Sequence, residues 1–293
     1  MTGTGDRLTG TARLALLAPA GLLVALLLTV PLGLLLSYSL APGGSTRADF
    51  SAGLTLENYV DILGDAFYLG IIFKTLWLSL IITAASIAIG WPLAYFLWKA
   101  PRRFKALLSV AVVAPLLISI PVRNYGWMVI LGDTGVVNKA LLGLGLIRQP
   151  LRMMFTDFAI VLGLTHVLMP FVVLSVLATL ERIPDNLAEA AQSLGANRLR
   201  AILAVVVPLS MPGVLAGGTL VFCVAISAYV TPALMGPSGA KYSATLVYQQ
   251  FVSTFDWPRG AAIATVLLAI TVAALALVLG LANRRYRHLL RSN

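Results

Sequence analysis

The chain has 293 residues, of which 59% are hydrophobic and only 11% are charged, whereas a soluble domain carries about 25% charged residues. This composition, with a mean hydropathy of +0.92, excludes a soluble globular protein and favours one that spans a lipid bilayer. A formal net charge of +10 is also typical of nucleic-acid-binding proteins, so the positions of the charges decide between the two.

The first element is a long apolar segment near the N-terminus. No charged residue occurs between Arg13 and Arg47, a stretch of 33 residues. The apolar region of a secretory signal peptide has only about 7–15 residues. We therefore expect a retained first membrane helix rather than a cleaved signal.

Charged residues divide the rest of the chain into apolar segments that are long enough to span a membrane. Between Lys74 and Lys99, for example, lie 24 uncharged residues, and a spanning helix needs about 20. Helices are expected because each one satisfies its own backbone hydrogen bonds in hydrocarbon. The sequence predicts an all-α, polytopic membrane protein with one transmembrane domain over residues 1–293. Its six spans are expected at about 14–40, 70–98, 106–131, 158–180, 206–235 and 260–283.

The lysines and arginines predict the orientation of these spans. With a cytoplasmic N-terminus, the inner segments 1–13, 99–105, 181–200 and 284–293 carry 13 basic residues, and the longer outer segments carry seven. This is the positive-inside bias, and it predicts cytoplasmic N- and C-termini in a multi-pass protein of the cell inner membrane. The net charge is then +9 inside and 0 outside. The excess charge lies at the inner membrane face, so no nucleic-acid binding is expected.

The inner loop 181–205 has a pattern that a simple connection does not need. Pro184 ends the fourth span, and Asn186 is expected to cap a short helix, with Glu189 completing a capping box. Gly195 falls where a left-handed residue ends a helix. A second helix is expected to begin near Asn197 and to run towards the membrane.

The same pattern predicts a role for the short helix. Two turns are marginal in isolation, so something must hold them. Ala188, Ala190 and Ala191 give a smooth face for close contact, and Arg198 and Arg200 flank it with positive charge. We interpret the segment as a rigid knob at the inner surface that transmits a push to the adjoining spans.

This loop resembles the EAA loop of binding-protein-dependent ABC importer permeases. The family pattern is followed by Glu189-Ala190-Ala191, then three residues, Gly195, nine residues and Val205-x-Val207-Pro208. The family pattern ends Ile-x-Leu-Pro, and this chain has valine at both aliphatic positions. In that family the loop is a coupling helix that docks into a cytoplasmic ATPase subunit. The resemblance implies an ATPase contact formed by Asn186, Glu189, Ala190, Ala191, Gly195 and Arg198.

ATP itself is expected on a partner. A phosphate-binding P-loop requires a Gly-Lys dipeptide, and the sequence contains none. We expect no cofactor in this chain and ATP bound by separate cytoplasmic ABC ATPase subunits. The resemblance also implies a second permease chain, in a heterodimer, an extracytoplasmic solute-binding protein, and alternating access as the mechanism.

A second resemblance concerns the cargo. Residues 123–127 (RNYGW) with 131–138 (LGDTGVVN), and also 229–236 (YVTPALMG) and 248–251 (YQQF), look like the corresponding segments of spermidine/putrescine permeases. The resemblance implies a polyamine cargo. Permeases for iron, thiamine, sulfate and phosphonates share parts of this layout, and these cargoes are the alternatives.

The candidate translocation path is drawn from these segments. Aromatic faces attract cations by about 0.5–2 kcal/mol, and acidic residues near the outer mouth, Asp133, Asp157 and Asp256, would attract them too. The candidate path residues are Arg123, Tyr125, Trp127, Asp133 and Tyr229.

Arg123 is the exception to this chemistry, because a cation in the path would repel a polycation and favour an anion. A charge within a span normally faces a cavity or a partner. Three alternatives remain for it: lining the path, pairing with Asp133 or Asp157, or capping carbonyl groups beside Pro121.

Two other classes of function fit the sequence less well. A secondary transporter driven by an ion gradient requires acidic residues within its spans, and the predicted spans contain none. An enzyme requires paired acids with histidine or a nucleophile beside a base. The sequence has no such arrangement and no ligand-spaced cluster around Cys223, His166 or His288. We therefore predict no catalytic residue and no metal site.

Overall fold

The computed structural model describes residues 10–44, 53–184, 186–237 and 242–290, and these residues contain helices and connections but no strand. Only the backbone is described for residues 10–17, 102, 188, 189, 279 and 281–290.

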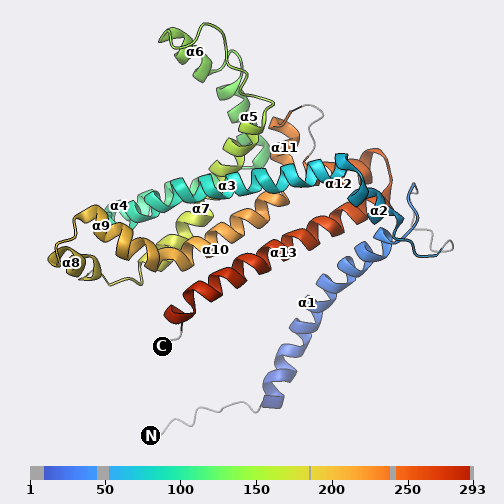
Figure 1. Cartoon of the computed structure of the whole chain (residues 1–293), viewed down its shortest axis with the longest axis horizontal. Coiled ribbons are helices and arrows are strands. Elements are labelled where there is room, and N and C mark those ends of the chain that lie inside the picture. Colours follow the sequence, from blue (N-terminus) through green and yellow to red (C-terminus); the bar gives the residue numbers. More distant parts are fainter. Residues whose placement is uncertain (1–9, 45–52, 185, 238–241, 291–293) are drawn as a thin grey trace. The chain divides into compact units, whose positions relative to one another are not determined.

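The chain is a succession of helices of very different length (Figure 1). In order they are α1 (Gly10–Ser39), α2 (Glu57–Gly64), α3 (Ala66–Lys99), α4 (Arg102–Leu117), α5 (Ile120–Leu131), α6 (Val136–Gly143), α7 (Asp157–Leu180), α8 (Asn186–Ser193), α9 (Arg198–Ala201), α10 (Val207–Ile226), α11 (Val230–Met235), α12 (Ser243–Tyr248) and α13 (Trp257–Leu290). Two π-helical turns, Ile202–Val206 and Gln249–Ser253, precede α10 and follow α12.

Among the described residues, five helices are long and apolar enough to cross a membrane: α1, α3, α7, α9 continued into α10, and α13. A sixth span results if the bent pair made of α4 with α5 and α6 crosses once. The predicted all-α protein with several membrane spans is confirmed. The cytoplasmic position of its termini stays a prediction.

The chain forms two compact units. The first contains Met1–Asp65 and Val247–Val266, and the second contains Ala66–Leu246 and Leu267–Asn293. The first unit therefore holds α1, α2, the end of α12 and the start of α13, and the second holds α3 to α11, the start of α12 and the rest of α13.

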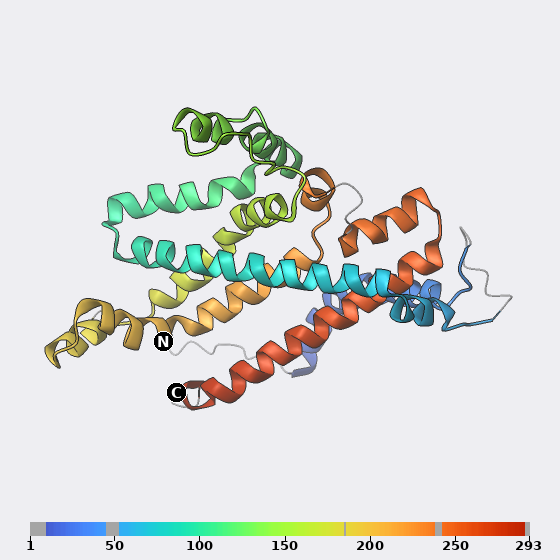
Figure 2. The same cartoon turned by 45° about the horizontal axis from the view of Figure 1, so that its top comes forward.

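The second unit is built around α3, α7 and α10, which pack side by side (Figures 1 and 2). Their contact is lined by buried aliphatic side chains, including Ile82 of α3, Val172 and Val176 of α7, and Val221 of α10. In a lipid bilayer there is no hydrophobic driving force between helices, because the lipid tails are as apolar as the side chains. Close packing of small and branched side chains therefore holds the helices together.

Two glycines bring α10 onto the backbone of α7. A Cβ added to Gly213 would lie 2.6 Å from the carbonyl oxygen of Ser175, and one added to Gly217 would lie 2.8 Å from the Cα of Val172. Real Cβ atoms essentially never come within 3.0 Å of such atoms. Gly213 and Gly217 have the GxxxG spacing, which allows the backbones of two membrane helices to come this close.

Gly217→Ala is expected to lower the melting temperature of the detergent-solubilised chain, because the added methyl group must push α10 away from α7. Overpacking of this kind costs about 1–3 kcal/mol. Gly70→Ala in α3 is the matched control, since a Cβ there meets no atom within 4 Å and alanine favours a helix. Equal melting temperatures for the two variants would contradict the close contact.

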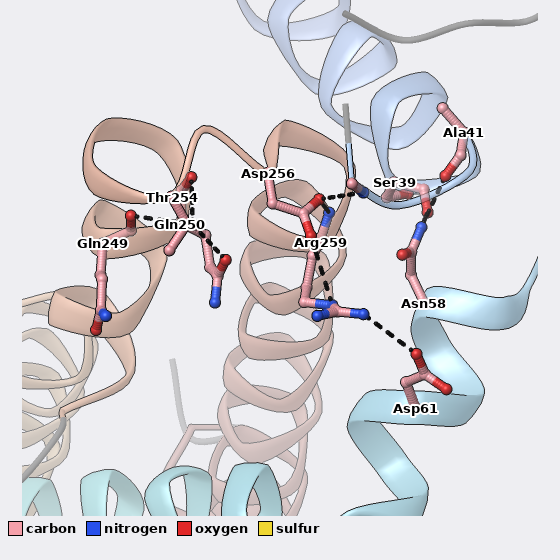
Figure 3. Close-up of polar contacts among 10 residues, drawn as sticks. Ser39, Ala41, Asn58, Asp61, Gln249, Gln250, Thr254, Asp256 and Arg259 are labelled. Carbon is pink, nitrogen blue, oxygen red and sulfur yellow. Dashed lines mark hydrogen bonds and ion pairs between the residues drawn. The ribbon is translucent and has the colours of Figure 1, made fainter. Parts of the chain in front are cut away.

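The first unit is joined by polar contacts that Figure 3 draws. Asn58 of α2 donates from Nδ2 to the carbonyl oxygens of Ser39 (3.2 Å) and Ala41 (2.8 Å), which follow the end of α1. Arg259, in the first turn of α13, lies 3.3 Å from a carboxylate oxygen of Asp61 in α2. These contacts connect three segments that are far apart in the sequence.

Asp256 belongs to the same network and is 9% exposed. Its carboxylate accepts hydrogen bonds from the backbone N–H groups of Gly44 (3.1 Å) and Arg259 (3.2 Å). The carboxylate is thus already engaged, and the structure gives it a place in the contact between α1 and α13 rather than an open position for a passing cation.

Candidate functional site

The predicted knob is a separate short helix at one end of the second unit. Figures 1 and 2 place α8 and α9 together there, between the end of α7 and the start of α10. The π-helical turn Ile202–Val206 continues α9 into α10, so Arg198–Ile226 forms one long helical stretch. Movement of α8 and α9 would therefore act directly on a membrane-spanning helix.

Gly195 ends α8 in the way that the sequence predicts. Its φ is +92°, a region that L side chains rarely adopt. The N–H of Gly195 donates to the carbonyl oxygen of Gln192 (2.9 Å), and the N–H of Ala196 donates to that of Ala191 (3.1 Å). These two bonds form a Schellman motif. Next, Asn197 caps α9 by accepting a 2.8 Å hydrogen bond from the N–H of Arg200.

Several predicted contact residues of α8 are visible in this arrangement. Asn186 is the first residue of the helix, Ala190 is exposed and Ala191 is partly exposed. Arg198, the first residue of α9, is exposed. The side chain of Glu189 lies outside the described residues, so the capping box stays a prediction.

Two exposed leucines of this segment were not among the predicted contact residues. Leu187 is 40% exposed and Leu194 is 91% exposed. With Ala190 and Ala191 between them, they form the i, i+3, i+4, i+7 stripe of an amphipathic helix. The stripe was available in the sequence, but only the structure shows that its members are exposed or partly exposed among the described residues.

The third predicted span is broken. A continuous helix was expected over about 106–131, but α4 ends at Leu117 and α5 begins at Ile120. The stretch Arg103–Leu117 is bent by 99° relative to Ile120–Gly143, which contains α5 and α6. Ile118 and Ser119 have ψ angles of 132° and 136°, which are extended. Pro121 explains the position of the break, because proline lacks an N–H and fits the first turn of a new helix.

Arg123 lies at this break and is only 7% exposed. Its Nη1 donates to the carbonyl oxygens of Pro115 (2.8 Å) and Ile118 (3.4 Å), which have lost their helical partners. This geometry corresponds to the third alternative for Arg123, in which its side chain caps carbonyl groups. Asp157 instead pairs with Lys74 at 2.8 Å, and Asp133 is exposed in the turn after α5.

One face of α5 contacts two neighbouring helices. Asn124 donates from Nδ2 to Oγ1 of Thr231 in α11 (3.2 Å). Trp127 donates from Nε1 to Nδ1 of His166 in α7 (3.4 Å), with their rings edge to face. His166 therefore makes a helix-packing contact. Arg123, Asn124 and Trp127 share this buried side of α5.

The structure does not bring all the candidate path residues together. Tyr125 is 58% exposed and lies on a different face of α5 from Asn124. Asp133 lies beyond the end of that helix. Tyr229 is half-buried at the junction that precedes α11.

That junction is a second break, because α10 ends at Ile226 and α11 begins at Val230, where a continuous helix was expected over about 206–235. Pro232 is the third residue of α11, again in a first turn where its missing N–H is tolerated.

Tyr242 stabilises this second break, and nothing in the sequence singled it out. It is 2% exposed and its hydroxyl donates to the carbonyl oxygen of Ala225 (2.8 Å) near the end of α10. Ser79 of α3 lies 2.9 Å from the same hydroxyl. Burial raises the pKa of Tyr242 to about 12, and the hydrogen bond with Ser79 acts in the opposite direction. The hydroxyl thus stays a proton donor at physiological pH.

Comparison with known proteins shows which family shares this architecture. Residues 86–289 match the family described as the inner membrane component of binding-protein-dependent transport systems. The chain is 35% identical over 230 residues to the spermidine/putrescine transport system permease protein PotB of Escherichia coli K12, covering 78% of this chain and 83% of that protein. It is 32% identical over 222 residues to PotB of Haemophilus influenzae, covering 75% and 77%.

Solved structures agree on the fold. A chain of a bacterial alginate ABC transporter, in complex with its periplasmic protein, superposes with a TM-score of 0.72 over 95% of both chains at 17% identity. A chain of the MetNI methionine ABC transporter gives a TM-score of 0.53 over 76% of this chain and 98% of that one, at 19% identity. With its several apolar spans, the chain is a multi-pass inner-membrane protein. It belongs to the family of inner membrane components of binding-protein-dependent transport systems.

Proposed function

We propose that this chain is the non-catalytic permease subunit of an ATP-driven importer and forms the path for a polyamine such as spermidine or putrescine. The observation that carries the cargo assignment is the 35% identity over 230 residues to a spermidine/putrescine permease. This match extends over 78% of this chain and 83% of that protein, so it is not confined to one motif.

The energy would come from cytoplasmic ABC ATPase subunits that bind ATP and dock on α8. The exposed or partly exposed stripe of Leu187, Ala190, Ala191 and Leu194 supports this, because apolar side chains exposed at the tip of a protein mark an interaction surface. The continuous stretch Arg198–Ile226 gives the contact a mechanical connection to the membrane. A second permease chain and an extracytoplasmic binding protein complete the assembly.

The chemistry of the path is compatible with a polycation that is bound weakly. Trp127 and Tyr229 are half-buried and Tyr125 is exposed, so aromatic faces are present at both breaks. The guanidinium of Arg123 keeps its charge, but it is buried and donates to two carbonyl oxygens, whose dipoles offset part of the repulsion that a passing polycation would feel. Specificity would then rest mainly with the binding protein.

The test is uptake of labelled spermidine and putrescine by cells that lack their own polyamine import and express this chain with its proposed partners. We expect ATP-dependent accumulation that excess unlabelled polyamine abolishes and that iron, thiamine, sulfate and phosphonate leave unchanged. Accumulation of one of those other solutes, without any of polyamine, would contradict the cargo but retain the importer. Uptake without any ATPase subunit would contradict the importer.

A further inference from the structure

A hairpin formed by α3 and α4 has its turn at the same end of the second unit as α8 and α9 (Figures 1 and 2). Only Ala100 and Pro101 separate the two helices, and a connection this short restrains each helix to the other. At its other end, α4 leads into the break at Ile118 and Ser119. The position of the hairpin therefore bears on the position of α5, which carries several of the candidate path residues.

The segment that carries α8 contacts this hairpin where the segment begins. We call residues 181–210 the coupling segment. Glu181, which follows the last residue of α7, forms an ion pair with the Nζ of Lys105, the fourth residue of α4. The two side chains are 48% and 30% exposed, and an exposed ion pair adds little to the stability of a fold. The contact thus links α4 to the coupling segment but contributes little to holding the bundle together.

The coupling segment contacts the same hairpin again where the segment ends. Trp91 of α3 donates from Nε1 to the Oγ of Ser210 in the first turn of α10, at 2.8 Å. Ser210 is fully buried, and its hydroxyl donates in turn to the carbonyl oxygen of Val207 (2.9 Å). Two hydrogen bonds therefore hold this hydroxyl in place, and one of them connects the start of α10 to α3.

Apolar side chains accompany both polar contacts. Ile183, close to the start of the coupling segment, and Ile202, in the π-helical turn before α10, pack against one buried cluster. The cluster contains Leu97 of α3 and Leu180 of α7, and Leu108 of α4 packs against it as well. The hairpin and both ends of the coupling segment thus share one apolar core.

We propose that the two polar contacts make the α3–α4 hairpin move with the coupling segment, so that the four residues that form them are positioning residues for transport. The stretch Arg198–Ile226 carries a push on α8 to α10. The two contacts would carry the same push to the hairpin and, through α4, to the break at Ile118. The inference rests on the proposed function, because it assigns a route by which the ATPase acts on the path.

The test measures how many spermidine molecules are transported for each ATP hydrolysed, in proteoliposomes that contain the full chain with its proposed partners. Lys105→Gln with Ser210→Ala removes one partner from each contact. An ion pair and a hydrogen bond of this kind each contribute modestly. We expect the ratio to fall by about tenfold, which corresponds to about 1.4 kcal/mol, while ATP hydrolysis and ATPase association stay normal.

Lys74→Gln is the matched control. Lys74 forms an ion pair with Asp157 between the first turns of α7 and the outer half of α3, and its side chain is 32% exposed, close to the 30% of Lys105. This variant should leave the ratio unchanged. Lys105→Glu alone should lower the ratio, and Lys105→Glu with Glu181→Lys should restore it, because the reversed pair can form the same contact. A purely structural role would not produce this recovery at constant ATP hydrolysis.

The proposal is overturned if the double variant keeps the normal ratio, if Lys74→Gln lowers the ratio equally, or if the reversed pair does not recover it. Loss of ATPase association in the double variant would also overturn it, because the contacts would then serve docking. Absence of ATP-driven spermidine uptake by the unmodified assembly is a different result, which contradicts the proposed function and this inference with it.

Discussion

Substitution of Gly195 with proline is expected to reduce ATP-driven uptake by about 100-fold and to release the ATPase, while the chain still inserts in the membrane. The backbone of Gly195 has a φ of +92°, whereas proline fixes φ near about −65°. Proline also removes the N–H that donates to Gln192. A cost of about 3 kcal/mol corresponds to about 100-fold, and a two-turn helix has little stability of its own to oppose it.

The chain supplies a matched control for this experiment. Gly145 follows α6 with a φ of +69°, and its N–H donates to Leu142 while that of Leu146 donates to Leu141, both at 3.0 Å. This is the same Schellman motif in a different place. Gly145→Pro carries the same local strain and should leave ATPase association intact. An equal loss of association in both variants would show a general folding defect and contradict the specific role of α8.

A second variant tests the contact surface without altering the backbone. Leu194 is 91% exposed, so Leu194→Asp removes no packing within the chain and should leave its melting temperature unchanged. It should nevertheless weaken co-purification of the ATPase, because the charge would have to be buried in the contact. Normal co-purification would exclude the apolar stripe of α8 as the docking surface.

The sequence predicts well those helix ends that depend on hydrogen bonds between nearby residues. The end of α8 at Gly195 and the start of α9 at Asn197 depend on hydrogen bonds between residues within five positions of one another. The residue types that allow them, glycine with positive φ and asparagine as a cap, can be recognised directly. The resemblance over the same residues then supplied a function that no local rule contains.

The broken spans could not be placed in this way. Apolar character continues across Ile118 and across Ala228, so hydropathy alone predicts continuous helices there. Pro121 and Pro232 are visible in the sequence, but proline within a span is compatible with a mere kink. The decision depends on distant partners, such as Arg123 for the carbonyl groups of α4 and Tyr242 for the end of α10, and such contacts have no sequence signature.

Arg123→Leu is expected to abolish most uptake and to lower the melting temperature of the chain. The substitution leaves the carbonyl oxygens of Pro115 and Ile118 without their donor, and an unsatisfied buried acceptor costs about 1–3 kcal/mol. Both effects have one cause, since the bend between α4 and α5 sets the positions of Asn124 and Trp127 on their partners. Arg152→Leu, at an exposed position, removes the same charge and should change neither quantity.

Arg123→Gln separates the two physical roles of this side chain. Its amide can still donate a hydrogen bond to a carbonyl oxygen but carries no charge. If Arg123 acts by capping the end of α4, glutamine should recover a large part of the melting temperature and of polyamine uptake relative to leucine. If the positive charge itself matters to the passing solute, glutamine should restore stability without restoring uptake. An uptake of Arg123→Leu equal to that of the unmodified chain would refute both roles, because neither the bend nor the charge would then be needed for transport.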